Sequence, residues 1–284
     1  MKRPLFSVII PCFRDHDLAF DAVASCLRQQ DVSDFEVVVV DDGSDKADFA
    51  AFSARFSGEA RVTLLWQPNA GPSAARNAGV QASTGKYLLF LDSDDQIGSR
   101  YLSCAREAIT GGGGGEKSMV VCPFSYYSQP GRAGNSLMAY FRAPRLLSRP
   151  FFDQFCILTG NCFPISSCVV SRAFFNEVGG FDERLTHHED WDLWIRLIKA
   201  RPELCYTDAE YSGATYIRMR QGQMSNAEAM KSSQMQVIAR HAVGSASLLL
   251  SRGGWIAARL VRWLIIGVQL ALGYPDQHIR QGRC

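Results

Sequence analysis

The sequence predicts an α/β protein in which a mostly parallel central sheet is flanked by helices. Two observations lead to this fold class. Short apolar runs alternate with segments whose apolar residues recur at helical spacing, and this alternation repeats three times between residues 5 and 91. The runs are also apolar at successive positions, as in strands that helices cover on both faces. Repeated units of this kind form parallel sheets with right-handed crossovers.

The first predicted strand is 5–10, which we expect to end at Pro11 because proline cannot donate to a sheet ladder. From Leu18 the apolar positions recur at helical spacing as far as Gln30. The elements expected next are, in order, a strand at 35–40, a helix at 46–56, a strand at 62–66, a helix at 72–82 that starts at Gly71-Pro72, and a strand that ends at Leu91.

Beyond residue 99 the pattern is less regular. We expect a helix to about residue 109, a flexible loop at the five glycines 111–115, strands at 118–122 and 165–171, and a helix at 172–178. Residues 128–164 show little periodicity and many aromatic residues, so we expect an irregular lobe that lines an acceptor pocket.

The composition is that of an ordinary globular chain of 284 residues, with 47% hydrophobic and 20% charged residues. A formal net charge of +2 gives no reason to expect a nucleic acid as partner. The nine cysteines form no Cys-x-x-Cys pair, which favours reduced thiols in the cytoplasm over disulfides or a zinc site. The apolar stretch at the N-terminus is too short for a signal peptide or a spanning helix.

The first functional signal is a cluster of three carboxylates, Asp92, Asp94 and Asp95, at the end of the apolar run 87–91. Ligand sites of open parallel sheets lie beyond the carboxyl ends of the strands. In an extended chain, Asp92 and Asp94 point to one side and Asp95 to the other. Two like charges on one side favour a hard cation such as Mg²⁺ or Mn²⁺, although a plain polar turn explains the residues equally well.

A second acid cluster, at 187–192, leads into the apolar segment 193–198, which predicts a helix with acids in its first turn. The helix dipole and the unpaired N–H groups favour acids there, so from these residues alone a plain N-terminal cap is the better interpretation. Adjacent histidines such as His187 and His188 point apart, which favours a solvated or structural role over metal binding.

Four motifs stand in order along the chain: Ser7-Val8-Ile9-Ile10-Pro11, Val40-Asp41-Asp42-Gly43-Ser44, Ala74-Ala75-Arg76-Asn77-Ala78-Gly79 and Leu91-Asp92-Ser93-Asp94-Asp95. Together they resemble the family 2 glycosyltransferases, over roughly residues 5 to 225. The order of the four motifs is far more specific than any one of them. The resemblance implies the Rossmann-like GT-A fold and the transfer of a sugar from a nucleotide-sugar donor with inversion.

Within this resemblance, Pro11 and Phe13 are similar to the residues that flank the nucleotide base, and Asp42 is similar to the residue that bonds the base. Asp92-Ser93-Asp94 matches the DXD motif of the family. The match implies that Asp94 contacts the metal, Mn²⁺ or Mg²⁺, and that Asp92 binds the donor ribose or supports the metal.

Glu189-Asp190 resembles the Glu-Asp pair of the family, which changes the interpretation of the second cluster. Asp190 becomes the candidate catalytic base, and Glu189 becomes a substrate-binding residue. Arg76 resembles a donor-site residue. Arg218 and Arg220 stand where some members have a His, and they are candidates to neutralise the leaving diphosphate, although a solvated edge explains them equally well.

Two features depart from the family pattern. Arg14 stands where the family commonly shows Asn, which bears on donor choice or on a loop contact. The Gln-x-x-Arg-Trp signature of processive synthases is missing, since its nearest match, Arg259 to Trp263, stands in a different context. We therefore expect one transfer per encounter.

The resemblance divides the chain into a GT-A domain at 1–225 and a C-terminal helical extension at 226–284. In a helix from Trp255 to Leu272, basic residues gather on one side and leucines on the other, so this helix is amphipathic and basic. Two interpretations stay open for 250–275. It makes peripheral contact with an anionic membrane, or it packs on the domain or on a second subunit of a homodimer.

The resemblance thus implies a metal-dependent transferase with a nucleotide-sugar donor, a UDP-sugar as first choice, and a glycan or lipid-linked acceptor. Its expected place is the assembly of a cell-surface glycan or glycolipid, in the cytoplasm or peripherally at the inner face of the plasma membrane. Two alternatives stay open: a catalytically inactive scaffold that binds nucleotide sugars, and a sugar nucleotidyltransferase. The latter needs a Gly-rich basic turn after the first strand, and Pro11-Cys12-Phe13-Arg14 is not one.

Overall fold

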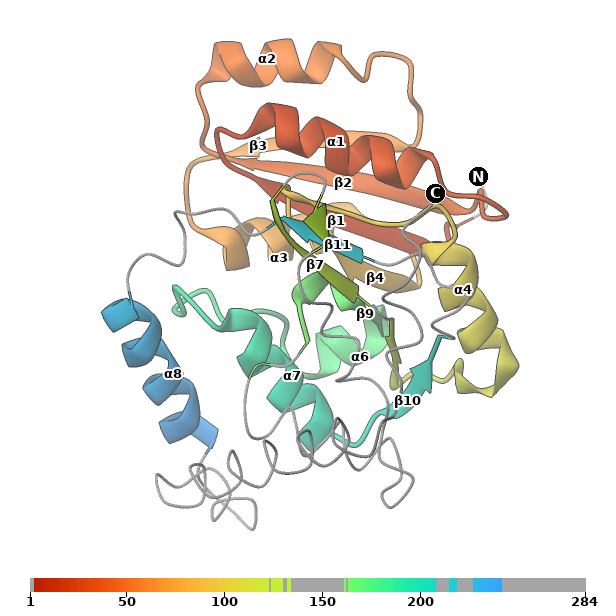
Figure 1. Ribbon diagram of the computed structural model, residues 1–284, viewed down its shortest axis with the longest axis vertical. Coiled ribbons are helices and arrows are strands. Elements are labelled where there is room, and N and C mark those ends of the chain that lie inside the picture. Colours follow the sequence, from red (N-terminus) through yellow and green to blue (C-terminus); the bar gives the residue numbers. More distant parts are fainter. Residues whose placement is uncertain are drawn as a thin grey trace.

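The computed structural model of the chain describes residues 3–122, 124–129, 132–133, 161, 163–207, 215–218 and 227–241 (Figure 1). The first half contains β1 (Phe6–Cys12), α1 (His16–Leu27), β2 (Phe35–Asp42), α2 (Lys46–Ala54), β3 (Val62–Gln67), α3 (Pro72–Ala82) and β4 (Tyr87–Phe90). The second half contains β5 (Asp95–Gln96), α4 (Tyr101–Ala108), a π-helical turn (Ile109–Gly113), β6 (Ser118–Val121), β7 (Phe124–Gln129), β8 (Arg132–Ala133), a 3₁₀ turn (Ile165–Ser167), β9 (Cys168–Ser171), α6 (Arg172–Glu177), α7 (Glu189–Lys199), β10 (Glu203–Tyr206), β11 (Thr215–Arg218) and α8 (Ala227–His241). The predicted alternation of strands and helices is confirmed.

A seven-stranded sheet forms the centre of the molecule, in the order β10-β6-β9-β4-β1-β2-β3. β9 runs antiparallel to both of its neighbours and the other strand pairs are parallel, so the prediction of a mostly parallel sheet is confirmed. β1 lies between β2 and β4, with Cys12 opposite Asp41 and Ile9 opposite Phe90. The carboxyl ends of these three strands therefore meet at one edge of the sheet.

Apolar layers cover both faces of this sheet, because successive residues of a strand point to opposite faces. Ile9 of β1 belongs to one layer, together with residues of α3, α6, α7 and α8. Val8 and Ile10 belong to the other layer, together with residues of α1, α2 and α4. All three side chains are fully buried. The continuous apolar runs in the sequence thus correspond to strands that helices cover on both sides (Figure 1).

A glycine lets α3 lie close against the sheet. A Cβ atom on Gly79 would come within 2.4 Å of Ile9 Cγ2 and 3.2 Å of Val40 Cγ2, so a larger residue would force the helix away. The helix starts as predicted at Gly71-Pro72, where Gly71 has a positive φ of 93° and Pro72 occupies the first turn. This close packing fixes α3, and with it Arg76, relative to the tips of β1 and β2.

The structure differs from the predicted element boundaries in two places. β1 continues through Pro11, which lies opposite Val40, because the missing N–H removes one ladder bond and leaves the backbone extended. The predicted strand 165–171 begins only at Cys168, because Ser167 N–H bonds to the carbonyl of Pro164 and closes a 3₁₀ turn.

The predicted flexible loop at the five glycines is wrong in its first part. α4 continues into a π-helical turn over Ile109–Gly113, and the turn contains Gly112 with a φ of 130°. Glycine tolerates that conformation, which a side chain would strain. The glycines therefore end a helix here instead of forming an open linker.

A second, four-stranded sheet has the order β5-β11-β7-β8. β11 runs antiparallel to β5, with Ile217 opposite Asp95, and parallel to β7. β7 and β8 extend into 128–164, where we expected no regular structure, and most of that segment lies outside the described residues. β7 pairs with the distant β11, and the local periodicity of a sequence does not reveal such pairing.

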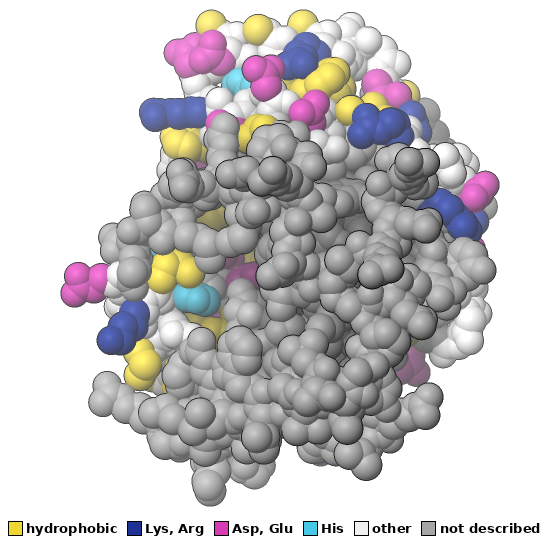
Figure 2. All heavy atoms as spheres, in the orientation of Figure 1, with side chains coloured by type: hydrophobic (Ala, Val, Ile, Leu, Met, Phe, Trp, Pro, Cys, Tyr) yellow, Lys and Arg dark blue, Asp and Glu magenta, His cyan; other side chains and the backbone are white. Residues whose placement is uncertain are grey.

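The described surface carries charges of both signs. On the face shown in Figure 2, acidic and basic side chains lie interspersed over α1 and α2. The six cysteines that the structure describes are all buried and free. Within the described ranges, no helix combines the length and apolar character needed to cross a membrane. The predicted basic helix at 250–275 lies outside these ranges, and the domain boundary at 225 stays a prediction.

Candidate active site

Phe13 and Arg14 follow β1 and form an exposed rim at the carboxyl edge of the sheet. Phe13 is 40% exposed, and the Arg14 guanidinium lies 4.7 Å from the centre of its ring. Arg14 has a left-handed backbone with a φ of 64°, and its N–H donates to Ser44 Oγ over 2.8 Å. The turn after Pro11 therefore exposes an aromatic ring, as stacking on a nucleotide base requires.

Asp42, at the end of β2, holds the loop that precedes α3. Its Oδ1 accepts hydrogen bonds from Gln67 Nε2 at 2.7 Å and from Ala70 N at 2.9 Å, and its Oδ2 accepts one from Gly71 N at 2.8 Å. Only 4% of the residue is exposed. These bonds give Asp42 a structural role in shaping the loop, and its bond to a nucleotide base stays a prediction.

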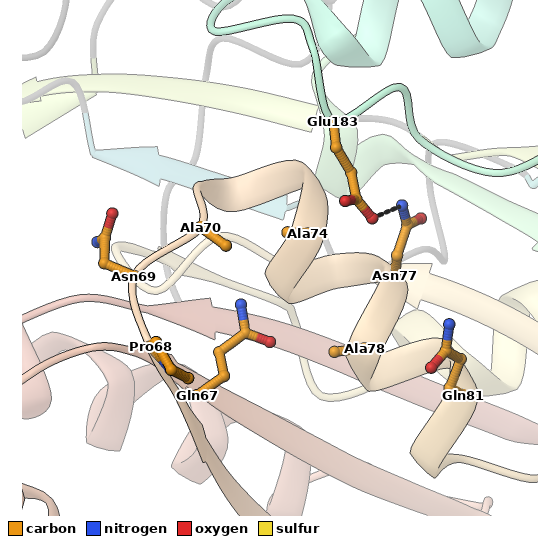
Figure 3. A pocket seen from close by; sticks show the side chains of 9 residues that line it. All are labelled: Gln67, Pro68, Asn69, Ala70, Ala74, Asn77, Ala78, Gln81 and Glu183. Atoms are coloured by element: carbon orange, nitrogen blue, oxygen red, sulfur yellow. Dashed lines mark hydrogen bonds between the residues drawn. The ribbon is translucent and has the colours of Figure 1, made fainter.

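The same loop borders a hollow of about 420 Å³ on the outer side of α3 (Figure 3). Ala74 and Ala78 line it from the helix. Asn77 Nδ2 donates to Glu183 Oε1 at 2.9 Å and to the carbonyl of Phe181 at 3.0 Å, and its Oδ1 accepts from Phe181 N. α3 is thus fastened to the segment that leads into α7.

The first acid cluster forms a turn. β4 ends at Phe90, and the N–H of Asp95 donates to the carbonyl of Asp92 over 3.0 Å, so the predicted extended geometry of these residues is wrong. Asp95 also differs from the other two acids in its burial. It is only 3% exposed and accepts from Ser166 Oγ at 2.7 Å, whereas Asp92 and Asp94 are half-buried.

Arg76 connects the two acid clusters. This connection was not predicted from the sequence. Its Nη2 lies 2.7 Å from Asp92 Oδ1 and its Nη1 lies 2.8 Å from Glu189 Oε1, while only 5% of the side chain is exposed. Burial by itself lowers the pKa of Arg76, but the two carboxylates outweigh it and the pKa is raised. One buried positive charge therefore fixes a carboxylate from each cluster.

α7 begins at the second acid cluster. His188 precedes the helix with a left-handed φ of 58°, and its side chain caps no N–H group. Asp190 Oδ1 instead accepts from the N–H of Trp191 at 2.7 Å, in agreement with an N-terminal capping role. Its second oxygen, Oδ2, accepts from Asn161 Nδ2 at 2.9 Å. Capping thus uses only one of the two oxygens of Asp190.

The surroundings of Asp190 raise its pKa to about 7. Burial is the largest cause, because it disfavours the charged form, and the negative charge of the adjacent Glu189 adds to it. The bonds from Asn161 and the Trp191 N–H, together with the charge of Arg76, act in the opposite direction. A carboxyl group with a pKa near neutrality is suited to act as a general base.

The turn at 92–95 fits a hard divalent cation. It offers carboxylate oxygens and no nitrogen or sulfur ligand, the donor set that suits Mg²⁺ or Mn²⁺ better than zinc. The side chain of Asp92 is 39% exposed, and its Oδ2 has no hydrogen-bond partner among the described residues. Asp92 and Asp94 are therefore the residues that could hold a metal.

A second group of metal-binding residue types, Cys12, His16 and Asp41, has a different explanation. Their ligand atoms lie within 4.8 Å of one another, and His16 Nε2 is 2.6 Å from Asp41 Oδ2. That distance is a hydrogen bond and leaves no space for a cation between the two atoms. The pair fastens the start of α1 to the end of β2.

Most of the predicted site residues lie at the carboxyl edge of the seven-stranded sheet. For two of them, Arg218 and Arg220, the side chains are not described. Arg218 is the last residue of β11 and follows Ile217, the partner of Asp95, so its backbone lies beside the turn. Arg220 lies outside the described residues. Asn161 was not predicted as a site residue, because it comes from the segment 128–164, which carries no motif and no periodicity.

Comparison with known proteins agrees with this geometry. A family model described as Glycosyl transferase family 2 matches residues 7–178. Amylovoran biosynthesis glycosyltransferase AmsB of Erwinia amylovora is 29% identical over 206 residues, which are 70% of this chain and 65% of AmsB. The chain spans less than two thirds of the length of the curated relatives that it matches first, 64% of one and 41% of another.

Solved structures share the fold. TarS 1-349 of S. aureus in complex with UDP-GlcNAc matches with a TM-score of 0.67 and 19% identity, over 96% of this chain and 77% of that one. Mannosyltransferase PcManGT of Pyrobaculum calidifontis in complex with GDP-Man and Mn²⁺ matches with a TM-score of 0.63 and 15% identity, over 97% of this chain and 82% of that one. The predicted GT-A fold is confirmed.

Proposed function

The chain belongs to glycosyl transferase family 2, and we propose that it is an inverting, metal-dependent enzyme that moves one sugar per encounter from a nucleotide-sugar donor to an acceptor hydroxyl. The observation that carries the proposal is the position of Asp190. This carboxyl group has a pKa raised to about 7 and follows Glu189, which Arg76 joins to Asp92 in the DXD turn. One guanidinium thus connects the donor-side turn with Glu189, the residue next to the proposed base.

On the donor side, Phe13 stacks on the nucleotide base, Pro11 flanks it, and Asp42 bonds it. The exposed ring of Phe13 at the tip of β1 supports this assignment. The complexes of TarS with UDP-GlcNAc and of PcManGT with GDP-Man support a nucleotide sugar as donor. A UDP-sugar is the first donor to test.

Asp94 and Asp92 hold a divalent cation, Mn²⁺ or Mg²⁺. The carboxylate oxygens of the turn and the Mn²⁺ in the PcManGT complex support this assignment. When bound, such a cation supplies Lewis-acid relief of the negative charge on the leaving diphosphate. Arg218, whose backbone lies beside the turn, and Arg220 add positive charge for the same diphosphate.

Asp190 acts as the general base. Its carboxylate takes the proton of the acceptor hydroxyl while the acceptor oxygen forms a bond to the anomeric carbon of the donor sugar. The bond from that carbon to the diphosphate breaks, and its electron pair leaves with the nucleoside diphosphate. Because attack and departure take place on opposite faces of the sugar, this single displacement inverts the anomeric configuration.

The acceptor is a glycan or a lipid-linked sugar, and the product contributes to a cell-surface polysaccharide or glycolipid. The name of AmsB, an amylovoran biosynthesis glycosyltransferase, supports a role in polysaccharide assembly. We place the reaction in the cytoplasm. The extension 226–284 then serves to pack on the domain or on a second subunit, or to contact the inner face of the plasma membrane.

The test is a transfer assay that also follows the anomeric configuration. The protein is incubated with a panel of UDP- and GDP-sugars and glycan acceptors, each with Mn²⁺, with Mg²⁺ or with EDTA, and release of nucleoside diphosphate is measured. We expect release from one donor, only with a divalent cation, and a product of inverted configuration by NMR. Retention of configuration contradicts the proposal, and donor binding without any release identifies an inactive binding protein.

A further inference from the structure

The helix α8 lies against α7, the helix that carries the proposed base (Figure 1). Val237 and Ile238 of α8 are buried in the apolar layer that also contains the buried residues of α7. Ser233 Oγ donates to the carbonyl of His187 over 2.5 Å, directly before the left-handed His188. α8 therefore packs on α7 and also reaches the backbone at its start.

A buried carboxylate, Asp192, connects the two helices. It is fully buried and accepts from Arg196 Nε of its own helix at 2.8 Å, and from His241 Nε2 at 2.8 Å and Arg240 Nη1 at 3.2 Å, both on α8. Burial by itself raises the pKa of Asp192, but these partners outweigh it and the pKa is lowered. A buried charge with three partners fixes the backbone that carries it.

Arg240 makes a second contact from α8. Its Nη1 lies 2.6 Å from Asp182 Oδ2, in the segment that leads into α7. The same guanidinium thus binds one carboxylate before the helix and one inside its first turns. This arrangement holds the entry to α7 on the side opposite to the transfer site.

Asp190 and Asp192 serve different sides of α7, because residues two positions apart on a helix are about 200° apart. Asp190 contacts Asn161, whereas Asp192 contacts α8. The start of α7 has little side-chain capping of its own, because His188 is left-handed and caps no N–H group, and Asp190 caps only the N–H of Trp191. The contacts of Asp192 support the helix one half-turn after Asp190.

We propose that Asp192, His241 and Arg240 are positioning residues of the transferase, which hold the first turn of α7 so that Asp190 stays directed at the acceptor hydroxyl. This inference rests on the proposed role of Asp190 as base and extends it to a helix beyond residues 7–178, the part that the family model matches. α8 then contributes residues that the transfer reaction needs.

Three full-length variants of α8 test the inference. His241→Leu removes the N–H that Asp192 accepts, His241→Gln keeps an N–H on a side chain of similar reach, and Ile238→Ala loosens the packing of the same helix. We expect His241→Leu to lower kcat about 10-fold to 100-fold with an unchanged donor KM, since a small misplacement of a reacting group has effects of this size. His241→Gln restores most of kcat. Ile238→Ala has the wild-type kcat at temperatures below the unfolding temperature of that variant.

The dependence of kcat/KM on pH gives a readout that loss of packing alone does not move. Wild-type activity falls as the pH drops through the pKa of Asp190, about 7. The groups that act on Asp190 are Glu189 and the Trp191 N–H on α7, Arg76 on α3 and Asn161. When the first turn loosens, Asp190 becomes more exposed and the effect of burial on its pKa decreases. The fall of kcat/KM on the acid side of the pH profile, the acid limb, therefore moves to lower pH in His241→Leu. In Ile238→Ala the acid limb stays in place.

The inference is overturned if His241→Leu keeps the wild-type kcat and acid limb, or if it matches Ile238→Ala in both. Should His241→Leu fail to fold, Arg240→Met removes the more exposed partner of Asp192 and carries the same expectations. Asp190→Asn separates the two proposals. If Asp190→Asn keeps its turnover, the proposed base is wrong; if it is inactive while His241→Leu behaves as wild type, only the positioning role fails.

Discussion

The two acid clusters of the site place the same type of residue in opposite environments. In the turn after β4, the side chain of Asp92 is 39% exposed and paired with Arg76. At the start of α7, Asp190 is half-buried as well, but it lies beside the negative charge of Glu189 and its pKa is raised to about 7. The first carboxylate is therefore paired with a buried positive charge, whereas the second exchanges a proton near neutral pH.

This difference shows that neighbours decide what a carboxylate can do. A carboxylate that is paired with an arginine and partly open to solvent can offer its free oxygen to a cation that binds a donor diphosphate. A poorly hydrated carboxylate next to a like charge takes up a proton readily, so it suits the acceptor hydroxyl. Arg76 contacts both clusters, so substitutions on one side at a time separate the roles of the two carboxylates.

The largest effect is expected from Arg76→Met, which removes the charge that both clusters share. The variant leaves Asp92 and Glu189 without their buried partner, and breaking a buried ion pair typically destabilises a protein by about 3 kcal/mol or more. We expect the free energy of unfolding, measured with urea, to fall by that amount, together with loss of transfer. An Arg76→Met variant as stable and active as wild type would contradict the shared role.

Asp94→Ala changes the donor side alone. Removing one carboxylate leaves the donor diphosphate facing an incompletely held cation, so we expect donor affinity in Mn²⁺ to fall at least about tenfold, the lower bound for losing even a supporting group of a metal site. Calorimetry with nucleoside diphosphate, with Mn²⁺ and with EDTA, measures the change. Asp48→Ala, an exposed acid on α2, is the matched control. Equal affinity in Asp94→Ala and wild type would remove the metal role.

Phe13→Ala tests the donor side at the nucleotide base. Stacking of a base on an aromatic ring contributes about 1–3 kcal/mol, so we expect the Kd for nucleoside diphosphate to rise about tenfold while the fold stays intact. The fold is not at risk because Phe13 is 40% exposed. Circular dichroism and thermal melting provide the control. A Kd that does not change would place the base elsewhere.

The smallest effect concerns stability at the start of α7. The pKa of Asp190 is raised in the folded state, so its contribution to stability is present below the ordinary carboxyl range and is lost as the pH rises through about 7. Asp190→Asn has no such titration. We therefore expect the variant to gain stability relative to wild type between pH 5 and pH 8, measured by urea unfolding. Parallel curves for the two proteins would contradict the raised pKa.

Much of the fold could be predicted from the sequence, because its signals are local. The apolar runs at β1 and β2 and the Gly71-Pro72 start of α3 gave the parallel sheet and its edge. The position of the acids at 92–95 was predicted correctly. Their turn geometry was not predicted, since the periodicity of a sequence does not show where an extended strand ends. The glycines after α4 were misjudged for a similar reason: glycine permits a loop and equally permits the last turn of a helix.

The candidate site was less predictable, because its properties arise between distant residues. The resemblance to the family pointed to Asp190, but Asn161, Arg76 and Asp192 act on it or on its helix through contacts that no local pattern encodes. The raised pKa depends on burial, which follows from tertiary packing. Considered alone, the acids at the start of α7 indicated only a helix cap, and one hydrogen bond of Asp190 does serve that purpose.

The most direct test of the account measures donor binding and turnover together in Asp190→Asn. An amide fills nearly the same space as the carboxylate but cannot accept the proton of the acceptor hydroxyl. We expect an unchanged donor Kd by calorimetry and a kcat that is lower by about 100-fold to 10,000-fold, the usual contribution of a general base. Transfer at nearly the wild-type rate would show that the base lies elsewhere and would contradict the account.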